Sequence, residues 1–474
     1  MELNSHNFKK NAAKALEDDD LQASLAKLGT GFPLKRLAAA ARLPEFEDLR
    51  DQARDIKDHT LRHLDFYLER FEAKVQETGG KVHWARDIQM GRELVYNICK
   101  SVDAKTVTKG KSMIGEEMAI NEYLEEKGLI PVETDLGEYI IQLRNEPPSH
   151  IIAPAIHLRK SHVEEAFRKT HTDLPKDRVL DEPEDLLKEA RTMLRKEFIA
   201  ADVGITGANF MIAETGSTVI VTNEGNGDLT QTLPRVHIVL CSIEKVVPNL
   251  DDCATLLRVL ARSATGQEQS VYTTFSTGPA KENDPDGPEE FHVVILDNGR
   301  SRMLGHETHD MLRCIRCSAC INHCPVYQSV GGHAYGSIYP GPMGSVLTPA
   351  LHGLDKACDL PNASTMCGKC EEVCPVRIPL PRMLRSWREK QWEDGPVPVM
   401  QRWLMSWWAY WALRPKAYHF AAKLKIRVMG MLGRKNGHFK SLPATKAWTK
   451  SRDFPAPEGK TFQQLWSEKG GRRS

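Results

Sequence analysis

The sequence predicts three parts in chain order: an α/β domain preceded by helices, a cysteine-rich module, and a basic C-terminal region. The first prediction rests on short apolar segments that alternate with helical ones, a pattern typical of a parallel or mixed sheet. The second rests on two runs of closely spaced cysteines, and the third on a change of composition after about residue 395. A chain of 474 residues is long enough for several domains with sizeable cores.

The composition is that of a soluble globular protein. Hydrophobic residues make up 41% of the chain and charged residues 27%, and the net charge of +1 gives no sign of nucleic-acid binding. The N-terminus has no apolar run typical of a signal peptide, and no apolar stretch is long enough to predict a transmembrane helix. We therefore expect a cytoplasmic protein, in which eleven cysteines fit metal binding better than disulfides.

Residues 1–78 are predicted to form an N-terminal helical segment. Leu61, Leu64, Leu68 and Phe71 recur at helical spacing among charged residues, so they form one apolar stripe. The Gly79–Gly80 pair is expected to end this helix.

The α/β domain is expected over residues 79–300. A helix is predicted over Glu116–Glu126, before Gly128. Strands are predicted at Val82–Trp84, Thr106–Thr108, Tyr139–Leu143, Ile151–Ala153, Val219–Val221, His237–Leu240 and His292–Leu296.

A glycine-rich stretch over residues 204–228 is a candidate ligand site in this domain. Backbone N–H groups in such turns can bind a carboxylate, a phosphate or a coenzyme, and Glu214 and Glu224 are candidates for an acid, base or nucleophile there. The alternative is that these glycines only permit tight turns, because no nucleotide-binding fingerprint is present. Lower-ranked candidates follow predicted strands or loops: Lys109, Lys111, Ser112 and His157.

Two cysteine runs occupy the module expected over residues 301–395. The first is Cys314-x2-Cys317-x2-Cys320-x3-Cys324-Pro325, and the second is Cys367-x2-Cys370-x3-Cys374-Pro375. The first run has the spacing with which bacterial-type ferredoxins hold [4Fe–4S] clusters, and its fourth cysteine binds the other cluster. In the second run, Ser364 stands where the first cysteine would be.

The two-cluster pattern assigns seven cysteines. Cys314, Cys317, Cys320 and Cys374 would bind cluster one, and Cys324, Cys367 and Cys370 would bind cluster two. Cluster two then lacks one ligand, which Cys358, Ser364 or another oxygen ligand, a partner protein or nothing would supply. Structural zinc is the alternative use of such cysteine pairs, but successive x2 steps followed by x3-Cys-Pro favour iron–sulfur clusters. The remaining cysteines, Cys99, Cys241 and Cys253, are expected to be buried.

A Gly- and Pro-rich loop at residues 330–344 lies between the runs. It is expected to wrap a cluster, and the alternative is that His333 and the tyrosines line a site for a redox partner.

The C-terminal region, residues 396–474, is basic and rich in tryptophan. From residue 401 onward it has about 16 Lys and Arg residues against 3 Asp and Glu residues. A short predicted helix carries Trp403, Trp407, Trp408 and Trp411. This helix is expected to dock on the chain's own domains or on a partner subunit, and the alternative is peripheral contact with an anionic membrane.

The chain resembles the LutB/LldF family of iron–sulfur proteins of bacterial L-lactate utilization. The resemblance spans nearly the whole chain. It is carried by LysSerMet (111–113), GluThrAspLeuGlyGluTyrIleIleGln (133–142), ProProSerHisIleIleAlaProAlaIleHis (147–157), AlaAspValGlyIleThrGlyAlaAsnPhe (201–210), ThrAsnGluGlyAsnGly (222–227), AspAsnGlyArgSer (297–301), the CysIleArgCys run and ArgAspPheProAlaPro (452–457).

This resemblance implies a LUD domain, related to the sugar isomerase and CoA-transferase fold, followed by a two-cluster ferredoxin-type module. It implies that the seven cysteines bind two [4Fe–4S] clusters. It also implies a subunit of an L-lactate dehydrogenase-type complex that oxidises lactate to pyruvate with LutA-like and LutC-like subunits, and an unknown electron acceptor. We expect an electron-transfer role. The alternatives are that the LUD domain is itself catalytic on a carboxylic acid, or that the clusters belong to a regulatory binding protein.

Overall fold

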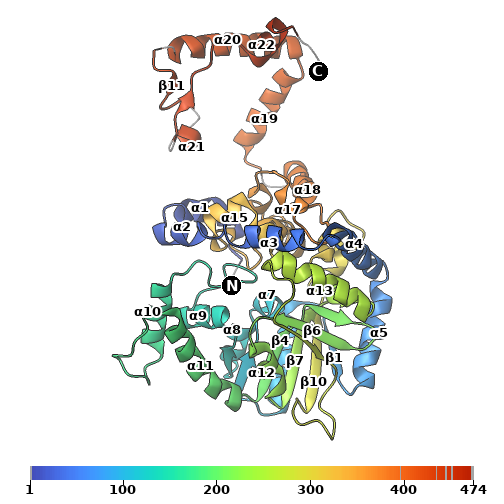
Figure 1. Cartoon of the computed structure of the whole chain (residues 1–474). Helices are drawn as coiled ribbons and strands as arrows, with labels where there is room; N and C mark the ends of the chain where they lie inside the picture. Colours follow the sequence, from blue (N-terminus) through green and yellow to red (C-terminus); the bar gives the residue numbers. More distant parts are fainter. Residues whose placement is uncertain (1–2, 395–396, 434, 443–445, 450–451, 471–474) are drawn as a thin grey trace. The chain divides into compact units, whose positions relative to one another are not determined.

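A computed structural model of the chain describes residues 3–394, 397–433, 435–442, 446–449 and 452–470. The chain divides into two compact units, residues 1–395 and residues 396–474 (Figure 1). Within the described residues, no helix is both long and apolar enough to cross a membrane.

A six-stranded parallel sheet is the centre of the first unit. Its strands lie in the order β1 (Lys81–Ala85), β10 (Glu290–Leu296), β7 (Val236–Ser242), β4 (Val203–Gly207), β2 (Thr106–Lys109) and β3 (Ile130–Glu133). The chain adds β3 on one side of β2 but adds β7 and then β10 on the other side of β4. The direction of winding therefore reverses between β2 and β4, which is where open α/β sheets bind ligands, beyond the carboxyl ends of their strands.

Both faces of this sheet are covered because its strands alternate apolar side chains between them. In β7, Ile238 packs with α6 (Ile88–Ser101), α7 (Met113–Met118) and α8 (Ile120–Glu126), whereas Val239 packs on the opposite face. That opposite face contacts α5 (Leu64–Glu77) and a second sheet. The second sheet has the order β8 (Val246–Val247), β5 (Phe210–Ile212), β6 (Ser217–Thr222) and β9 (Tyr272–Ser276).

The predicted N-terminal helices are present. They are α1 (Phe8–Ala15), α2 (Asp19–Leu25), α3 (Phe32–Ala41), α4 (Phe46–Arg62) and α5. The four residues of the predicted apolar stripe are all buried, although the chain bends at His63 and divides them between α4 and α5. The helix ends before Gly79–Gly80, as predicted.

Most predicted strands of the α/β domain are confirmed, but two are wrong. Residues 139–143 lie in α9 (Leu136–Arg144), which begins where the Asp135 carboxylate accepts hydrogen bonds from the N–H groups of Gly137 and Glu138. Residues 151–153 form a loop, in which a ring nitrogen of His150 accepts hydrogen bonds from the N–H groups of Ile152 and Ala153. An apolar run alone does not distinguish these structures.

The helix predicted over residues 116–126 is in fact two helices. Ala119 has a φ of 46°, so it ends α7 and begins α8 at a different angle. The remaining helices of the α/β domain are α10 (Lys160–Thr170), α11 (Pro183–Ala200), α12 (Asn226–Thr232) and α13 (Leu250–Ala264).

The cysteine-rich module shares one hydrophobic core with α4 and α13. Its helices are short, and they are α14 (Ala319–Asn322), α15 (Pro325–Val330), α16 (Gly341–His352), α17 (Lys369–Glu372) and α18 (Leu380–Glu393). The module is therefore built onto the α/β domain and the N-terminal helices rather than connected to them by a free linker.

The C-terminal unit consists of two longer helices and several short elements, with few buried residues among those described. They are α19 (Val399–Ala412), α20 (Pro415–Gly433), β11 (His438–Phe439), α21 (Lys446–Thr449), β12 (Phe454–Pro455) and α22 (Phe462–Glu468). Strands β11 and β12 form an antiparallel pair. No residue of α19 is buried, and Trp403, Trp407 and Trp408 are each more than half exposed.

Candidate functional site

Four cysteines line one small apolar cavity in the cysteine-rich module. Cys314 follows a short 3-10 helix (His309–Arg313), Cys317 lies in the next loop, Cys320 is in α14, and Cys374 comes from the second run. These are the four residues that the spacing pattern groups around cluster one. Residues sixty positions apart in the chain therefore meet at one site.

The other three predicted ligands, Cys324, Cys367 and Cys370, lie near one another. Cys324 is the N-cap residue of α15, and Cys370 is in α17. The buried hydroxyl of Tyr335 lies against the Cys324 thiol. It is therefore placed to donate a hydrogen bond to the sulfur of this predicted ligand.

The two runs repeat the same backbone conformation fifty residues apart. Arg316 and Ser318 both have φ values of 60°, and the equivalent residues Met366 and Gly368 have φ values of 57° and 82°. Left-handed residues on both sides of a cysteine are rare, so this match is a property of the ligand loop.

Ser364 is the counterpart of Cys314 in this repeat. Its hydroxyl oxygen accepts a hydrogen bond of 3.1 Å from the N–H of Met366 and so belongs to the ligand loop. Cys358, the other candidate for the missing ligand, lies in the segment before this loop, near Asp359 and Lys9.

The cysteine geometry fits a group larger than one metal ion. Four thiolates on a tetrahedral zinc ion, with Zn–S bonds of about 2.3 Å, would place their sulfurs about 3.8 Å apart. In the described part of the chain, however, no three cysteine sulfurs lie within 4.8 Å of one another. Burial raises the pKa of the Cys317 and Cys374 thiols, so a bound cationic group is needed to hold them as thiolates.

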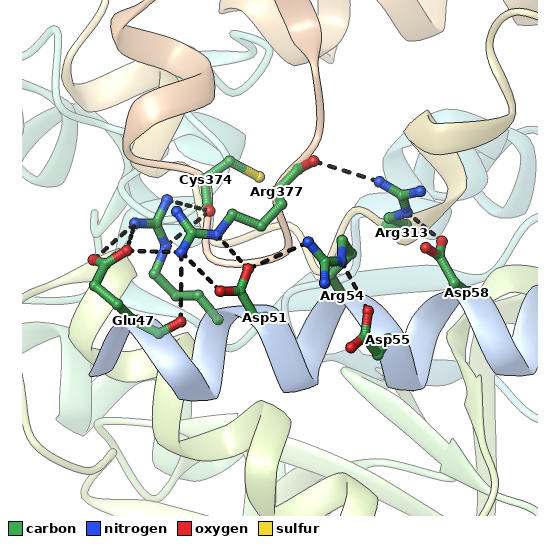
Figure 2. A network of polar contacts seen from close by, with 9 residues as sticks. Glu47, Asp51, Arg54, Asp55, Asp58, Arg313, Cys374 and Arg377 are labelled. Atoms are coloured by element: carbon green, nitrogen blue, oxygen red, sulfur yellow. Dashed lines mark hydrogen bonds and ion pairs between the residues drawn. The ribbon is translucent and has the colours of Figure 1, made fainter. Parts of the chain in front are cut away.

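Helix α4 supports the loop that carries Cys374 (Figure 2). The buried Arg50 guanidinium donates hydrogen bonds of 2.8 and 3.1 Å to the Cys374 carbonyl oxygen, and it pairs with Glu47 at 2.7 Å. In the same network, Arg377 pairs with Asp51 at 3.0 Å. These contacts connect the N-terminal helices directly to a predicted cluster ligand.

A cavity of about 290 Å³ lies beyond the carboxyl ends of the parallel strands. Its wall includes residues 110–114 after β2, residues 207–209 after β4 and residues 222–224 after β6. Cys317 and Arg316 line this cavity and also the cysteine cavity of cluster one. The candidate ligand site of the α/β domain therefore adjoins the predicted cluster.

Three cations line the larger cavity: Lys111, Lys245 and Arg316. The Arg316 side chain is only 8% exposed; one terminal nitrogen pairs with Glu244 at 3.2 Å, and the other has no partner. Lys245 is 6% exposed, and its amine has no hydrogen-bond or ion-pair partner among the described residues.

Behind this wall lies a buried ion network. Arg300 pairs with Glu117 at 2.6 Å and with Glu244 at 3.2 Å, and the Tyr339 hydroxyl donates to Glu117. Burial alone would raise the pKa of Glu244, but Arg300 and Arg316 lower it to about 2. The network therefore remains charged at neutral pH and holds Arg316 between the two cavities.

A second cluster of charged side chains, three carboxylates, surrounds Lys109, the last residue of β2. Its amine pairs with Glu133 at 2.6 Å and with Glu116 at 2.8 Å, and carboxylate oxygens of these two residues and Glu138 lie within 4.8 Å of one another. Burial raises the pKa of Glu133 to about 6, and burial also raises the pKa of Glu138. The charge of the Lys109 ammonium is balanced by these carboxylates. Lys109 does not line the ligand cavity.

The structure separates the other predicted site residues. Lys111, Ser112 and Glu224 line the larger cavity, whereas Glu214 does not and accepts a hydrogen bond from the N–H of Leu250. His157 pairs with Glu146 at 3.0 Å and contacts the His333 ring, with ring centres 4.5 Å apart. Cys99, Cys241 and Cys253 are buried, as expected.

Sequence reasoning missed two of the three cavity cations. Arg316 could have been noticed because it stands between two predicted ligands. Lys245 has no sequence signal, because only the fold brings the short 3-10 helix after β7 (Ile243–Lys245) next to the cysteine module.

Three family models match successive parts of the chain. The LUD domain family matches residues 68–296, the 4Fe-4S dicluster domain family matches residues 310–378, and the family of the lactate utilisation protein B C-terminal region matches residues 390–471. Lactate utilization protein B of Bacillus velezensis is 41% identical over 471 residues, which cover 99% of this chain and 98% of that protein. Its counterpart in Bacillus subtilis is 40% identical over 475 residues, covering 99% and 98%.

The chain belongs to the lactate utilization protein B family. This confirms the predicted resemblance, the LUD fold and an iron–sulfur cofactor. A solved structure described as a DUF162 family protein from Deinococcus radiodurans also matches, with 14% identity, a TM-score of 0.27, and coverage of 49% of this chain and 98% of that one.

Proposed function

We propose that this protein is the iron–sulfur electron-transfer subunit of a complex that oxidises L-lactate to pyruvate. Membership of the lactate utilization protein B family supports the pathway, and the 4Fe-4S dicluster domain supports the redox role. The observation that carries the proposal is that Cys317 and Arg316 line both the cysteine cavity and the cavity at the strand ends. An electron donor in the larger cavity would lie beside a cluster ligand.

Seven cysteines would hold the two clusters, and Ser364 is the proposed fourth ligand of cluster two. A [4Fe–4S] cluster supplies one-electron transfer, so two clusters suit the two electrons released when lactate becomes pyruvate. The protein positions and shields this chemistry. Arg50 fixes the Cys374 loop, and Arg316 separates the cysteine cavity from the larger one.

The proposal is tested by anaerobic purification with iron and acid-labile sulfide counted, followed by EPR of the reduced protein. We expect about eight irons per chain and two interacting cluster signals. Rapid appearance of these signals on adding L-lactate to the reconstituted complex supports the electron-transfer role. A zinc-containing protein without iron would overturn it, and so would clusters that stay oxidised with lactate in the complete complex.

A second candidate function is catalysis by the LUD domain itself on a carboxylic acid. It is favoured because Glu224 lines the cavity, where burial and Asp135 raise its carboxyl pKa. Glu214 is less suitable because it lies outside this cavity. Glu224→Gln should abolish turnover in the complex while cluster spectra stay unchanged, and full turnover by this variant would remove the candidate.

LutA-like and LutC-like subunits are the proposed partners, and the electron acceptor is a further partner of unassigned chemistry. For the C-terminal unit we propose peripheral contact with an anionic membrane surface. In α20, Phe420, Leu424 and Met431 form an exposed apolar stripe, and three cations, Lys423, Lys425 and Arg427, lie beside it. Exposed apolar rings and nearby cations are the two features that bind interfacial helices to anionic lipid.

A further inference from the structure

We propose that the cavity at the strand ends binds a small organic carboxylate, whose carboxylate group is held by Lys245 and Arg316 beside cluster one. Because it names a substrate class and a binding site for the electron-transfer role, this inference rests on the proposed function. It assigns the entry point of electrons to this chain rather than to a partner subunit.

The position of the cavity is the first argument. It lies where the winding of the sheet reverses, between the residues that follow β2 and those that follow β4. Ligands of open α/β sheets bind at this position because the loops diverge there and leave a crevice. A volume of about 290 Å³ is close to the lower end of the range for small-molecule sites, about 300–1,000 Å³.

Unpaired charge is the second argument. Lys245 is buried without a partner, and one terminal nitrogen of Arg316 is also buried without a partner. Buried ionised groups are normally paired, because removal from water costs several kcal/mol when no counter-charge replaces it. An unpaired ammonium on one cavity wall, beside a guanidinium nitrogen that makes no hydrogen bond, indicates an anion that the chain itself does not supply.

The acids near this wall do not remove the need for an anion. Glu244 is the only carboxylate that pairs with Arg316 in the described structure, and it is shared with Arg300. Asp135 lines the cavity, but its carboxylate caps the first turn of α9. Glu224 lines it from a loop at the solvent-exposed side.

The shape of the Arg316 site favours a planar carboxylate. The guanidinium lies over the Tyr339 ring at 5.0 Å, and its pairing with Glu244 uses one terminal nitrogen. The position of the guanidinium is therefore fixed, and its second terminal nitrogen is buried without a hydrogen-bond partner. A fixed guanidinium with a lysine close by binds carboxylates well, because both groups supply charge-assisted hydrogen bonds.

The apolar part of the wall suits the carbon skeleton of such an acid. Ile114, Ile151, Leu240 and Leu260 line the cavity together with the cations. Ile151 lines the cysteine cavity as well, so Ile151, Arg316 and Cys317 form the wall between a bound acid and cluster one.

A rival explanation is that Lys245 and Arg316 only compensate the negative charge of the cluster thiolates. Both cations do lie within electrostatic range of Cys314. This explanation predicts that loss of Lys245 changes the reduction potential of cluster one without affecting the binding of any acid. Direct binding measurements therefore separate the two explanations.

The test is isothermal titration calorimetry of the cluster-loaded full-length protein with L-lactate, pyruvate and lactamide. Lactamide has the size of lactate but no charge. We expect the two acids to bind and lactamide to bind at least about tenfold more weakly, because a charge-assisted contact is worth about a factor of ten or more. EPR of the reduced protein should show that lactate changes the signal of cluster one and not that of cluster two.

Lys245→Met should weaken lactate binding at least about tenfold with iron content unchanged. Lys100→Met, at an exposed lysine outside the cavity, is the matched control and should bind as wild type. If Lys245→Met does not fold, Lys245→Gln removes the same charge but keeps a polar group at this buried position. The proposal is overturned if the Lys245 variant binds lactate as wild type does, or if lactamide binds equally well.

The outcomes also separate this site from the proposed function. If the wild-type chain binds no acid but its clusters are reduced by lactate in the complete complex, the electron-transfer role stands and this site is wrong. If the chain binds lactate but the clusters stay oxidised in the complex, the site stands and the electron-transfer role fails.

Discussion

The Arg50 guanidinium donates two hydrogen bonds to the carbonyl oxygen of Cys374, at 2.8 and 3.1 Å. Arg50 lies in the N-terminal segment, whereas Cys374 is the last cysteine of the module, and 324 residues separate them in the chain. Helix α4 of the N-terminal segment therefore lies against the loop of a proposed ligand of cluster one (Figure 2). Its role is to fix a ligand loop that has no strand or long helix of its own.

Replacing Arg50 should weaken the module. Arg50→Met removes both side-chain donors from the Cys374 carbonyl oxygen, which then keeps only the N–H of Arg377 at 3.2 Å, and we expect this to cost about 2–3 kcal/mol of unfolding free energy. We also expect faster loss of iron in air. Arg54→Met is the control, because Arg54 lies on the same helix but pairs with the more exposed Asp51 and Asp55. Equal cluster stability in the two variants would contradict the role of Arg50.

The fourth ligand of cluster two can be identified by substitution. Cys358→Ala should retain both cluster signals, because Cys358 lies outside the repeated ligand loop. Ser364→Ala should convert cluster two to a three-iron form or leave one labile iron, and Ser364→Cys should restore a [4Fe–4S] signal with a changed potential. EPR with iron counting measures this. Loss of a cluster in the Cys358 variant alone would assign the ligand to Cys358 instead.

The ion network behind the cavity should be essential for stability. Arg300→Met leaves the buried Glu117 and Glu244 without their shared partner, and breaking such a buried pair costs about 3–5 kcal/mol. The melting temperature should therefore fall markedly. Arg302→Met, at an exposed arginine two residues later, should change it little. Similar melting temperatures for the two variants would rule out this role.

The three carboxylates around Lys109 should make the free energy of unfolding depend on pH. Burial raises the pKa of Glu133 from 4.5 to about 6, so the folded state binds more protons than the unfolded state between these values. Its contribution to the free energy of unfolding therefore falls as pH rises from about 4.5 to about 6. Glu138 acts in the same direction, because burial raises its pKa too.

Glu138→Gln should relieve part of this cost, because one oxygen of the buried Glu138 carboxylate has no partner. We expect the variant to be about 1–2 kcal/mol more stable than wild type at neutral pH, with a smaller difference at pH 5. Urea unfolding at both pH values measures this. Glu126→Gln, at an exposed position on α8, is the control. A variant less stable than wild type at neutral pH would contradict the prediction.

The C-terminal unit should bind anionic vesicles. Full-length protein should sediment with phosphatidylglycerol vesicles and release at high salt, because cations and exposed rings act together. Phe420→Ser with Leu424→Ser should weaken this binding, whereas Trp392→Ser, in the first unit, should not. Equal binding to neutral vesicles, or none to anionic ones, would favour docking on protein instead.

Local sequence determined much of this protein. The cysteine spacing is a property of short loops, so the two runs could be found without the fold, and Gly79–Gly80 ended a helix because glycine destabilises helices at any position. The alternation of strands and helices likewise predicted the α/β fold. Local signals failed at residues 139–143, because an apolar run suits a buried strand as well as a helix, and here the Asp135 cap selected the helix.

Tertiary structure alone decided the ligand cavity. Its walls come from residues near 111, 208, 245 and 316, which are distant in sequence and meet because the strands lie side by side in the sheet and the cysteine-rich module packs on the α/β domain. Lys245 is an ordinary lysine in the sequence, and it becomes significant because the fold buries it without a partner beside Arg316. Burial and pairing depend on distant contacts, so no local pattern reveals them.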